Sequence, residues 1–246
     1  MKFILSVVTP TFNSSKNISI AINALKSQTD KDFEWVVADG CSLDDTIDKI
    51  NRSGIDNINI IQQEDFGVFD ALNRAIKNSN GKYYLFIGCD DEIYPDTIKN
   101  FKLSILKNEA DIITSKLHFR NKVIEPGRGS VLLNGHGAYI SGHVVSTIFK
   151  KDLHNKYGFY STFFPIAADH DFILKIVSKG VSIKKVDFIA GRFTDGGQST
   201  LDKLGSYTEC WRIIMKYHNP ILVSAIQILK IIFSWRAILQ FNKRYK

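Results

Sequence analysis

The segment KYYLFIGCDDEIYP, residues 82–95, joins a run of apolar residues directly to a cluster of acids. The apolar run has the length and composition of a strand buried on both faces. Asp90, Asp91 and Glu92 follow it without a spacer, and the chain turns at Pro95. Carboxylates this close repel one another at neutral pH, so they need a cation or must take up protons. The segment therefore predicts a buried strand that ends at a charged site.

Three strand patterns alternate with three helix patterns before this segment. We expect strands at residues 4–10, 33–39 and 58–62 and helices at 17–27, 42–51 and 68–79. In the second helix, Ser42 stands in the cap position and Asp44 and Asp45 in the first turn, where the helix dipole favours acids. The alternation predicts an α/β fold with a mainly parallel sheet and helices on both faces.

Polar clusters follow three of the four expected strands. Residues 9–13, 39–42 and 90–92 stand where these strands end. Ligands of such sheets bind beyond the carboxyl ends of the strands, so we expect all three clusters to face one crevice. A divalent metal that keeps some water and binds substrate phosphates suits a pair of aspartates. The alternative, a solvated turn before the next helix, remains open at this point.

Composition excludes several classes of protein. The chain has 246 residues, 44% hydrophobic and 23% charged, which is ordinary for a soluble globular protein of one large domain. Its three cysteines are scattered, so neither a disulfide framework nor a zinc site is indicated, and a reduced, intracellular setting is expected. GxxxxGK[ST] and GxGxxG are both absent, which argues against a P-loop and a dinucleotide fold.

Residues 203–246 carry the whole excess of positive charge. They hold eight Lys or Arg and one acid, a difference of +7 that equals the net charge of the chain. The remaining residues are balanced, so a diffuse nucleic-acid-binding face is not indicated. The sequence instead predicts a basic C-terminal appendage.

Four ordered blocks of the sequence resemble those of a family 2 glycosyltransferase of the GT-A fold. They are SVVTPTFN (6–13), FEWVVADGCSLDDT (33–46), EDFGVFDALNRAIKNSNGKYYLFIGCDDEIYPD (64–96) and AADHDF (167–172). The resemblance covers roughly residues 4–200. Within the family, the sequence is most similar in type to non-processive enzymes that make bacterial surface polysaccharides, including lipopolysaccharide. It implies a Rossmann-like nucleotide-sugar-binding domain, a UDP-sugar donor, Mn²⁺ or Mg²⁺, and inversion at the anomeric carbon.

The resemblance also implies a donor site. By similarity, the residues around the nucleoside are Thr9, Pro10, Thr11 and Asn13, with Asp39 accepting a hydrogen bond from the base. Those that line the rest of the donor are Asp65, Gly67, Asp70, Asn73 and Arg74. The metal-binding block falls on GCDD, where Gly88 replaces the usual first acid. Asp90 is then the expected metal ligand and Asp91 its neighbouring candidate.

Direct displacement at a sugar needs a base that takes the proton of the acceptor hydroxyl. AADHDF resembles the block that supplies this base, and the matching position is Asp169, with Asp171 the alternative two residues on. RFTDGGQST (192–200) resembles a segment in which Gly196 and Gly197 approach a ligand. Loops at 126–146 are expected on the acceptor side, where His143 matches a histidine without an assigned role.

We therefore expect a GT-A catalytic domain at residues 1–202, with a nucleotide-sugar-binding half (1–92) and an acceptor-side half (93–202). Residues 203–246 are expected to form amphipathic helices, with Ser224, Gln227, Lys230 and Ser234 in one polar stripe. Because Lys230 and Arg236 would be costly inside a bilayer, the tail is expected to lie on the membrane surface.

The acceptor would be a saccharide or a lipid-linked saccharide, and the enzyme would be cytoplasmic, peripheral on the inner face of the cytoplasmic membrane. A helix packed on the catalytic domain, or on a second subunit in a homodimer, is the alternative for the tail. A nucleotidyltransferase and a non-catalytic nucleotide-sugar-binding protein are the alternatives for the function.

Overall fold

The computed structural model of the chain describes residues 2–141, 144–193 and 202–242, and within them the side chains of residues 144 and 234–242 are not described. The strands are β1 (Phe3–Thr11), β2 (Glu34–Asp39), β3 (Ile58–Gln62), β4 (Gly81–Phe86), β5 (Glu92–Ile93), β6 (Ile112–Phe119), β7 (Lys122–Ile124), β8 (Thr147–Lys150) and β9 (Ile183–Phe193). The α-helices are α1 (Ile18–Lys26), α2 (Thr46–Asn51), α3 (Val68–Lys77), α4 (Thr97–Lys107), α5 (Val131–Asn134), α6 (Asp152–Tyr157), α7 (Ala168–Val177), α9 (Lys203–Met215) and α10 (Pro220–Asn242). Two short 3₁₀ helices, η1 (Gly135–Ala138) and η2 (Val144–Ser146), complete the elements of these residues.

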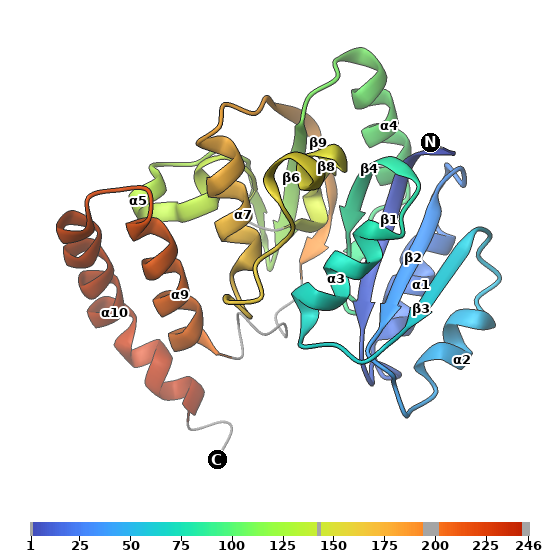
Figure 1. Ribbon diagram of the computed structural model, residues 1–246, viewed down its shortest axis with the longest axis horizontal. Coiled ribbons are helices and arrows are strands. Elements are labelled where there is room, and N and C mark those ends of the chain that lie inside the picture. Colours follow the sequence, from blue (N-terminus) through green and yellow to red (C-terminus); the bar gives the residue numbers. More distant parts are fainter. Residues whose placement is uncertain (1, 142–143, 194–201, 243–246) are drawn as a thin grey trace.

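All of these strands belong to one mixed sheet (Figure 1). Its order is β3-β2-β1-β4-β8-β6-β9-β5, and β7 pairs with β6. β1 runs parallel to β2 and β4, β2 parallel to β3, and β6 parallel to β9. β8 is antiparallel to both of its neighbours, so β4 and β6 point the same way. The predicted mainly parallel α/β sheet is confirmed, and six strands end at the same edge, which we call the carboxyl edge.

Helices cover both faces of the sheet, as predicted. The alternation of side chains along β1 sends Val7 into a core with α1, α2 and α4, and Val8 into a second core with α3, α6 and α7. Both valines are fully buried. The central strands therefore have no wet face, and their loops at the carboxyl edge are where function can be exposed.

The second helix starts later than predicted. α2 begins at Thr46 instead of Ser42. The Ser42 hydroxyl bonds to Asp39, and a carboxylate oxygen of Asp44 accepts the backbone N–H of Ser15, 3.0 Å away. These side chains tie the β2–α2 loop to the β1–α1 loop, and that use prevents them from capping a helix at Ser42.

The last two helices lie at one end of the molecule, with α10 outermost (Figure 1). α9 packs against α7, and α10 packs against α9 and α5. Within the part of the chain that the structure describes, no helix combines the length and the apolarity needed to cross a bilayer.

Candidate functional site

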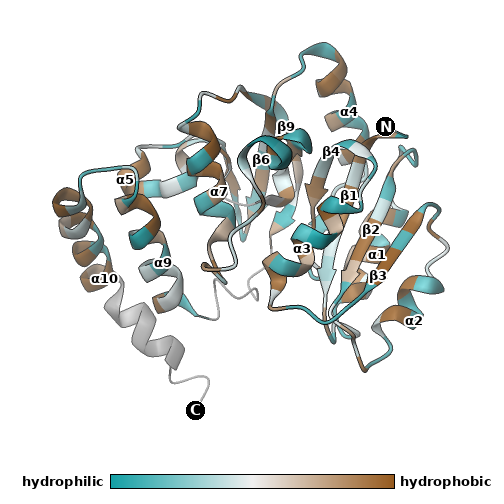
Figure 2. Cartoon of the chain, in the orientation of Figure 1, coloured by the Kyte–Doolittle hydropathy of each residue, from teal (hydrophilic) through white to brown (hydrophobic). Residues whose placement is uncertain are grey.

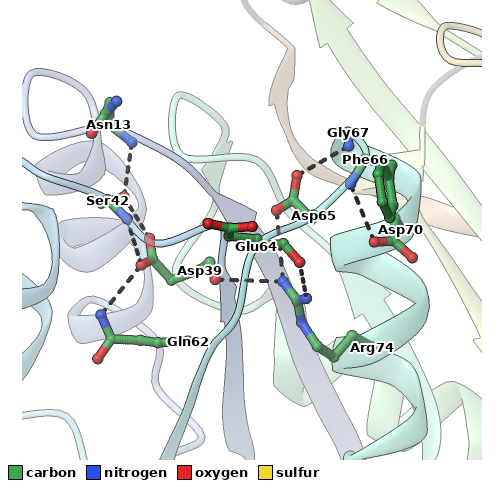
Figure 3. Close-up of polar contacts among 10 residues, drawn as sticks. All are labelled: Asn13, Asp39, Ser42, Gln62, Glu64, Asp65, Phe66, Gly67, Asp70 and Arg74. Carbon is green, nitrogen blue, oxygen red and sulfur yellow. Dashed lines mark hydrogen bonds and ion pairs between the residues drawn. The ribbon is translucent and has the colours of Figure 1, made fainter.

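Asp39 lies at the end of β2, buried, with its carboxylate held from two sides (Figure 3). It accepts hydrogen bonds from the backbone N–H of Ser42 at 2.9 Å, from the Ser42 hydroxyl, and from the Gln62 amide at 3.4 Å. The Ser42 oxygen also accepts the N–H of Asn13 at 2.8 Å. Asn13 has a φ of 45°, the left-handed region in which asparagine is tolerated. The β1 and β2 loops thus converge on one carboxylate.

Asp65 and Arg74 form an ion pair beside this carboxylate (Figure 3). Their charged atoms are 3.6 Å apart, and both side chains are mostly buried. Arg74 also donates to the backbone carbonyls of Glu64 at 3.2 Å and Asp39 at 3.4 Å. A β-carbon on Gly40 would lie 2.6 Å from the Asp65 carboxylate, so a larger residue there would displace Asp65. The ion pair therefore lies directly against the end of β2.

The start of α3 is organised by two acids. The N–H of Gly67 donates to Asp65 at 3.0 Å, and the N–H of Phe66 donates to Asp70 at 3.3 Å. Gly67 has a φ of 113°, which side chains rarely adopt. Asp70 therefore holds the loop that carries Asp65 in place. Its negative charge is also favourable at the start of α3, where the helix dipole is positive.

Two exposed aromatic rings beside this cluster had no assigned role in the sequence. Phe66 is 93% exposed, and Phe12 is 58% exposed. The Phe12 ring lies 3.2 Å from the point that a β-carbon on Gly40 would occupy. The signal that could have found them is an aromatic residue in each of two loops at the carboxyl edge, where a planar ligand can stack.

Three of the residues expected in the donor site hold the framework beneath it. Thr9 is fully buried, and its hydroxyl accepts the Trp35 indole N–H at 2.9 Å. Thr11 is buried at the end of β1, and its carbonyl accepts the N–H of Gly40 at 2.9 Å. Pro10 stands between them in β1, paired in register with β2. Of the four residues expected around the nucleoside, Asn13 is the exposed one.

Asn73 connects α3 to a distant loop. Its amide donates to the carbonyl of Tyr160 at 2.8 Å and accepts the N–H of Tyr160 at 3.0 Å. The side chain is buried, with 8% exposed. The structure therefore gives Asn73 the role of joining α3 to the loop between α6 and α7, with both of its side-chain polar atoms bonded to backbone.

The acid cluster after β4 separates into three different environments. Asp91 is buried and accepts the N–H of Gly88 at 2.8 Å, whereas Asp90 is half-buried and Glu92 is exposed on β5. Burial raises the pKa of Asp91 to about 7; the Gly88 N–H opposes the rise, and the charge of Asp90 adds to it. A β-carbon on Gly88 would meet carboxylate oxygens of Asp90 and Asp91, each at 3.1 Å. Two carboxylates therefore flank one point.

These oxygens fit a hard divalent cation in part. Mn²⁺ and Mg²⁺ prefer oxygen ligands and often take only one or two carboxylates besides substrate phosphates. Among the described residues, no group of three or more His, Cys, Asp or Glu could hold a metal ion by itself. The Asp90 and Asp91 oxygens thus fit an ion whose remaining ligands would come from a bound diphosphate and water.

Asp169 is the second residue of α7 and is half-buried. One of its oxygens accepts the N–H of His170 at 2.8 Å. Burial raises the pKa of Tyr160, and the charge of Asp169 adds to this rise.

Asp171 is 7% exposed and forms an ion pair at 2.8 Å with Lys216, which directly follows α9. The two aspartates of α7 are thus in different settings, because Asp171 is buried and paired with a lysine, whereas Asp169 is half-buried and accepts the N–H of the next residue.

Sequence reasoning missed Glu209 of α9. Its carboxylate accepts the N–H groups of Ile166 at 3.1 Å and Ala167 at 2.8 Å, directly before α7. It is the one acid in residues 203–246, and that isolation is the signal that could have found it. The remaining acceptor-side candidates, His143, Gly196 and Gly197, lie outside the described residues.

Comparisons with known proteins bear on the sequence and on the fold. The family model described as Glycosyl transferase family 2 matches residues 6–165. A PGL/p-HBAD biosynthesis glycosyltransferase of Mycobacterium bovis is 24% identical over 256 residues, 94% of this chain and 96% of that protein. The poly(ribitol-phosphate) beta-N-acetylglucosaminyltransferase TarS of Staphylococcus aureus is 34% identical over 123 residues, 48% of this chain and 21% of TarS.

Two solved structures share the fold. S. aureus TarS 1–349 in complex with UDP has a TM-score of 0.65 at 24% identity and covers 92% of this chain and 70% of that one. The mannosyltransferase PcManGT from Pyrobaculum calidifontis, in complex with GDP-Man and Mn²⁺, has a TM-score of 0.70 at 17% identity. It covers 99% of this chain and 74% of that one. The GT-A architecture expected from the sequence is confirmed.

Proposed function

The chain belongs to glycosyl transferase family 2, and from that premise we propose that it moves a sugar from a nucleotide-diphosphate-sugar to a saccharide acceptor, with inversion at the anomeric carbon. The observation that carries the proposal is the convergence of Asp39, Asp65 and the Asp90–Asp91 pair on one edge of the sheet. A crevice at this edge is where α/β sheets bind nucleotides.

The donor would lie over the ends of β1 and β2. Asp39 is oriented by Ser42 to accept a hydrogen bond from a base N–H, and the Phe12 and Phe66 rings offer faces for stacking. Asp65 and Arg74 would contact the sugar nucleotide beyond the base. We propose UDP as the nucleotide, with support from TarS, whose structure holds UDP. Residues 1–92 would thus form the donor half.

Asp90 would hold Mn²⁺ or Mg²⁺, with Asp91 beside it. Support comes from PcManGT, which holds Mn²⁺ with GDP-Man. When bound, such an ion supplies positive charge to the diphosphate that leaves. The chain's own contribution is the pair of oxygens that flank Gly88.

Asp169 would act as the general base. The acceptor oxygen attacks the anomeric carbon from the side opposite the diphosphate, the new carbon–oxygen bond forms, and the bond to the diphosphate breaks. The hydroxyl proton passes to the Asp169 carboxylate. Asp171 is supported less well, because Lys216 already pairs with it.

The acceptor would be a saccharide or lipid-linked saccharide of a bacterial surface polysaccharide, presented at the inner face of the cytoplasmic membrane. The names of the relatives, which refer to PGL/p-HBAD biosynthesis and to poly(ribitol-phosphate), support a cell-envelope pathway. Residues 93–202 would contact this acceptor, and residues 203–246 would form the membrane-facing tail.

Three substitutions test the chemistry on the full chain. Asp90→Ala should abolish transfer, and excess chelator should do the same to the wild type. Asp169→Asn keeps size and loses proton affinity, so the rate should fall at least about 100-fold while donor affinity is kept. Glu92→Ala, an exposed acid of the same cluster, is the matched control and should stay close to wild type.

Full activity of Asp90→Ala, or undiminished activity in chelator, would reject the metal assignment. Near-wild-type turnover of Asp169→Asn would move the base elsewhere, with Asp171→Asn the next variant. A protein that binds the nucleotide-sugar without turnover under any condition would be the non-catalytic binding protein.

A further inference from the structure

α10 contacts the domain through Val223, which is 1% exposed and lies in the core with α3 and α7, and through several polar residues. Ser224 accepts the indole N–H of Trp211 at 3.2 Å, and Gln227, 2% exposed, donates to the carbonyl of Leu132 at 3.2 Å. Lys230 donates to the same carbonyl at 3.5 Å. Three residues of the polar stripe that the sequence shows, Ser224, Gln227 and Lys230, are thus turned inward, against α9 and α5.

The opposite face of α10 is apolar and exposed. Large hydrophobic residues recur along it in three adjacent pairs: Ile221 (81% exposed) and Leu222 (51%), Ile228 (47%) and Leu229 (53%), and Ile232 (61%) and Phe233 (84%). Figure 2 shows hydrophobic residues along the described part of α10. A helix on the surface of a globular protein normally has the reverse arrangement. Contiguous exposed apolar surface marks an interaction site.

Charge decides between the partners that could cover this face. Residues 203–246 hold eight Lys or Arg against one acid, and α10 contains neither Asp nor Glu. Glu209 is already bound at the start of α7. Two copies of the chain joined through this region would bring like charges together, whereas anionic lipid headgroups complement them. None of the described helices is long and apolar enough to cross a bilayer, so we consider only shallow insertion of α10 from one side of the membrane.

We propose that the outer face of α10, from Ile221 to Phe233, inserts into the acyl-chain boundary of an anionic membrane while the polar stripe keeps the helix on the domain. This proposal extends the proposed function, and it rests on that function in one respect, the use of a lipid-linked acceptor. The catalytic domain would then be held at the height at which such an acceptor emerges from the bilayer.

Co-sedimentation with vesicles tests the surface without any sugar donor. Full-length protein should bind vesicles of phosphatidylcholine with phosphatidylglycerol, and the double variant Ile232→Ser/Phe233→Ser should bind at least about tenfold more weakly. Leu103→Ser/Leu106→Ser on α4, which are also exposed leucines, is the matched control and should bind like the wild type. Donor hydrolysis should be unchanged in both double variants, which also shows that they fold.

Equal binding by the wild type and Ile232→Ser/Phe233→Ser, or failure of the wild type to bind these vesicles, would overturn the proposal. So would a dimer in light scattering that the same double variant converts to a monomer, since the face would then join two copies. Loss of transfer with vesicle binding intact would count against the proposed function and leave the membrane surface standing.

A second inference concerns α9, which holds α7 at three levels. Glu209 accepts the N–H groups before α7, the Cys210 sulfur lies 3.1 Å from the His170 ring, and Lys216 pairs with Asp171 at 2.8 Å. The N-cap residue of α7 is Ala167, whose side chain cannot cap. The carboxylate from α9 instead holds the backbone directly before α7, and its negative charge is favourable at the positive end of the helix dipole.

We infer that Glu209 is a positioning residue for Asp169. Asp169 lies two residues beyond Ala167, whose N–H donates to Glu209. The inference rests on Asp169 being the base of the proposed reaction. Release of this end of α7 would let the base move relative to the acceptor, and small misplacements of a reacting group are costly in rate.

Steady-state kinetics of three variants test this role. Glu209→Ala should lower kcat about tenfold with little change in the KM for the donor. Glu209→Gln keeps an oxygen that can accept both hydrogen bonds, and it should recover most of kcat. Thr208→Ala, whose hydroxyl bonds only within α9 in the described structure, is the matched control and should equal the wild type.

A purely structural role would appear as a lower melting temperature with kcat unchanged below the transition, and that result would overturn the inference. So would equal losses in Glu209→Ala and Glu209→Gln. If Asp169→Asn itself turns over normally, the base assignment fails instead, whatever Glu209 does.

Discussion

Two helices of this chain, α3 and α10, both have one polar and one apolar face, and they use them in opposite ways. α3 buries Phe69, Leu72 and Ile76 against the sheet. α10 buries Gln227 and leaves Ile232 and Phe233 in the open. The spacing of residues reveals that a helix has two faces, but the surface beside the helix decides which of them is wet. For α3 that surface is an apolar sheet, and for α10 it is a row of backbone carbonyls and an indole.

The largest expected effect compares matched substitutions on the two helices. Leu72→Ala removes a fully buried side chain and should cost about 3 kcal/mol of unfolding free energy. Ile232→Ala removes an exposed one and should change it by no more than about 0.5 kcal/mol. Urea unfolding without lipid measures both. Similar losses for the two variants would show that the outer face of α10 is covered in solution, which would break the comparison.

Much of the part of the sheet that α3 covers, from Phe3 to Phe86, could be predicted from the sequence, because strands β1 to β4 and the helices between them are local patterns with short connections. The convergence of Asp39 and Asp90 followed from a general property of parallel sheets. The antiparallel insertion of β8 could not be predicted in this way, since it pairs residues such as Tyr84 and Phe149 that are far apart in the chain.

The C-terminal contacts were hidden for the same reason. The ion pair of Asp171 with Lys216 and the bond from Glu209 to Ala167 each join residues more than forty positions apart. No periodicity reports such pairs. The polar stripe of α10 was visible, but its partner, the carbonyl of Leu132, lies 95 positions away.

A smaller effect concerns pH, which should act on the core under α3. His154 is buried there, where its ring bonds to the Tyr84 hydroxyl at 2.7 Å. Burial lowers the pKa of His154 to about 4, and the charges of Lys175 and Lys151 add to the effect. The unfolded chain takes up a proton near pH 6.5 and the folded chain does not, so stability falls as pH drops from 6.5 toward 4.

Between about pH 6.5 and about pH 5 this group should remove about 2 kcal/mol, measured by urea unfolding at each pH. Burial also lowers the pKa of His170, to about 2, so His154→Gln should remove only part of the slope. An unchanged slope in His154→Gln would show that His154 does not contribute.

The smallest effect concerns the attachment of α10. Gln227→Ala should cost about 1 kcal/mol, because it removes the hydrogen bond of a buried side chain to the carbonyl of Leu132. The fluorescence of Trp211, which bonds to Ser224, should report looser packing. Ile228→Ala, on the outer face, is the control and should leave the spectrum unchanged. A spectrum that shifts only in Ile228→Ala would mean that the polar stripe does not hold the helix.

The central claim, that the carboxyl edge transfers sugar from a nucleotide donor, is tested most directly by a panel of nucleotide-sugars. Full-length protein with Mn²⁺ is offered each compound, and release of the nucleoside diphosphate is measured. We predict turnover of a UDP-sugar that is abolished in Asp90→Ala and at least about 100-fold lower in Asp169→Asn. Release that is equal in the wild type and both variants, or no binding of any nucleotide-sugar, would contradict it.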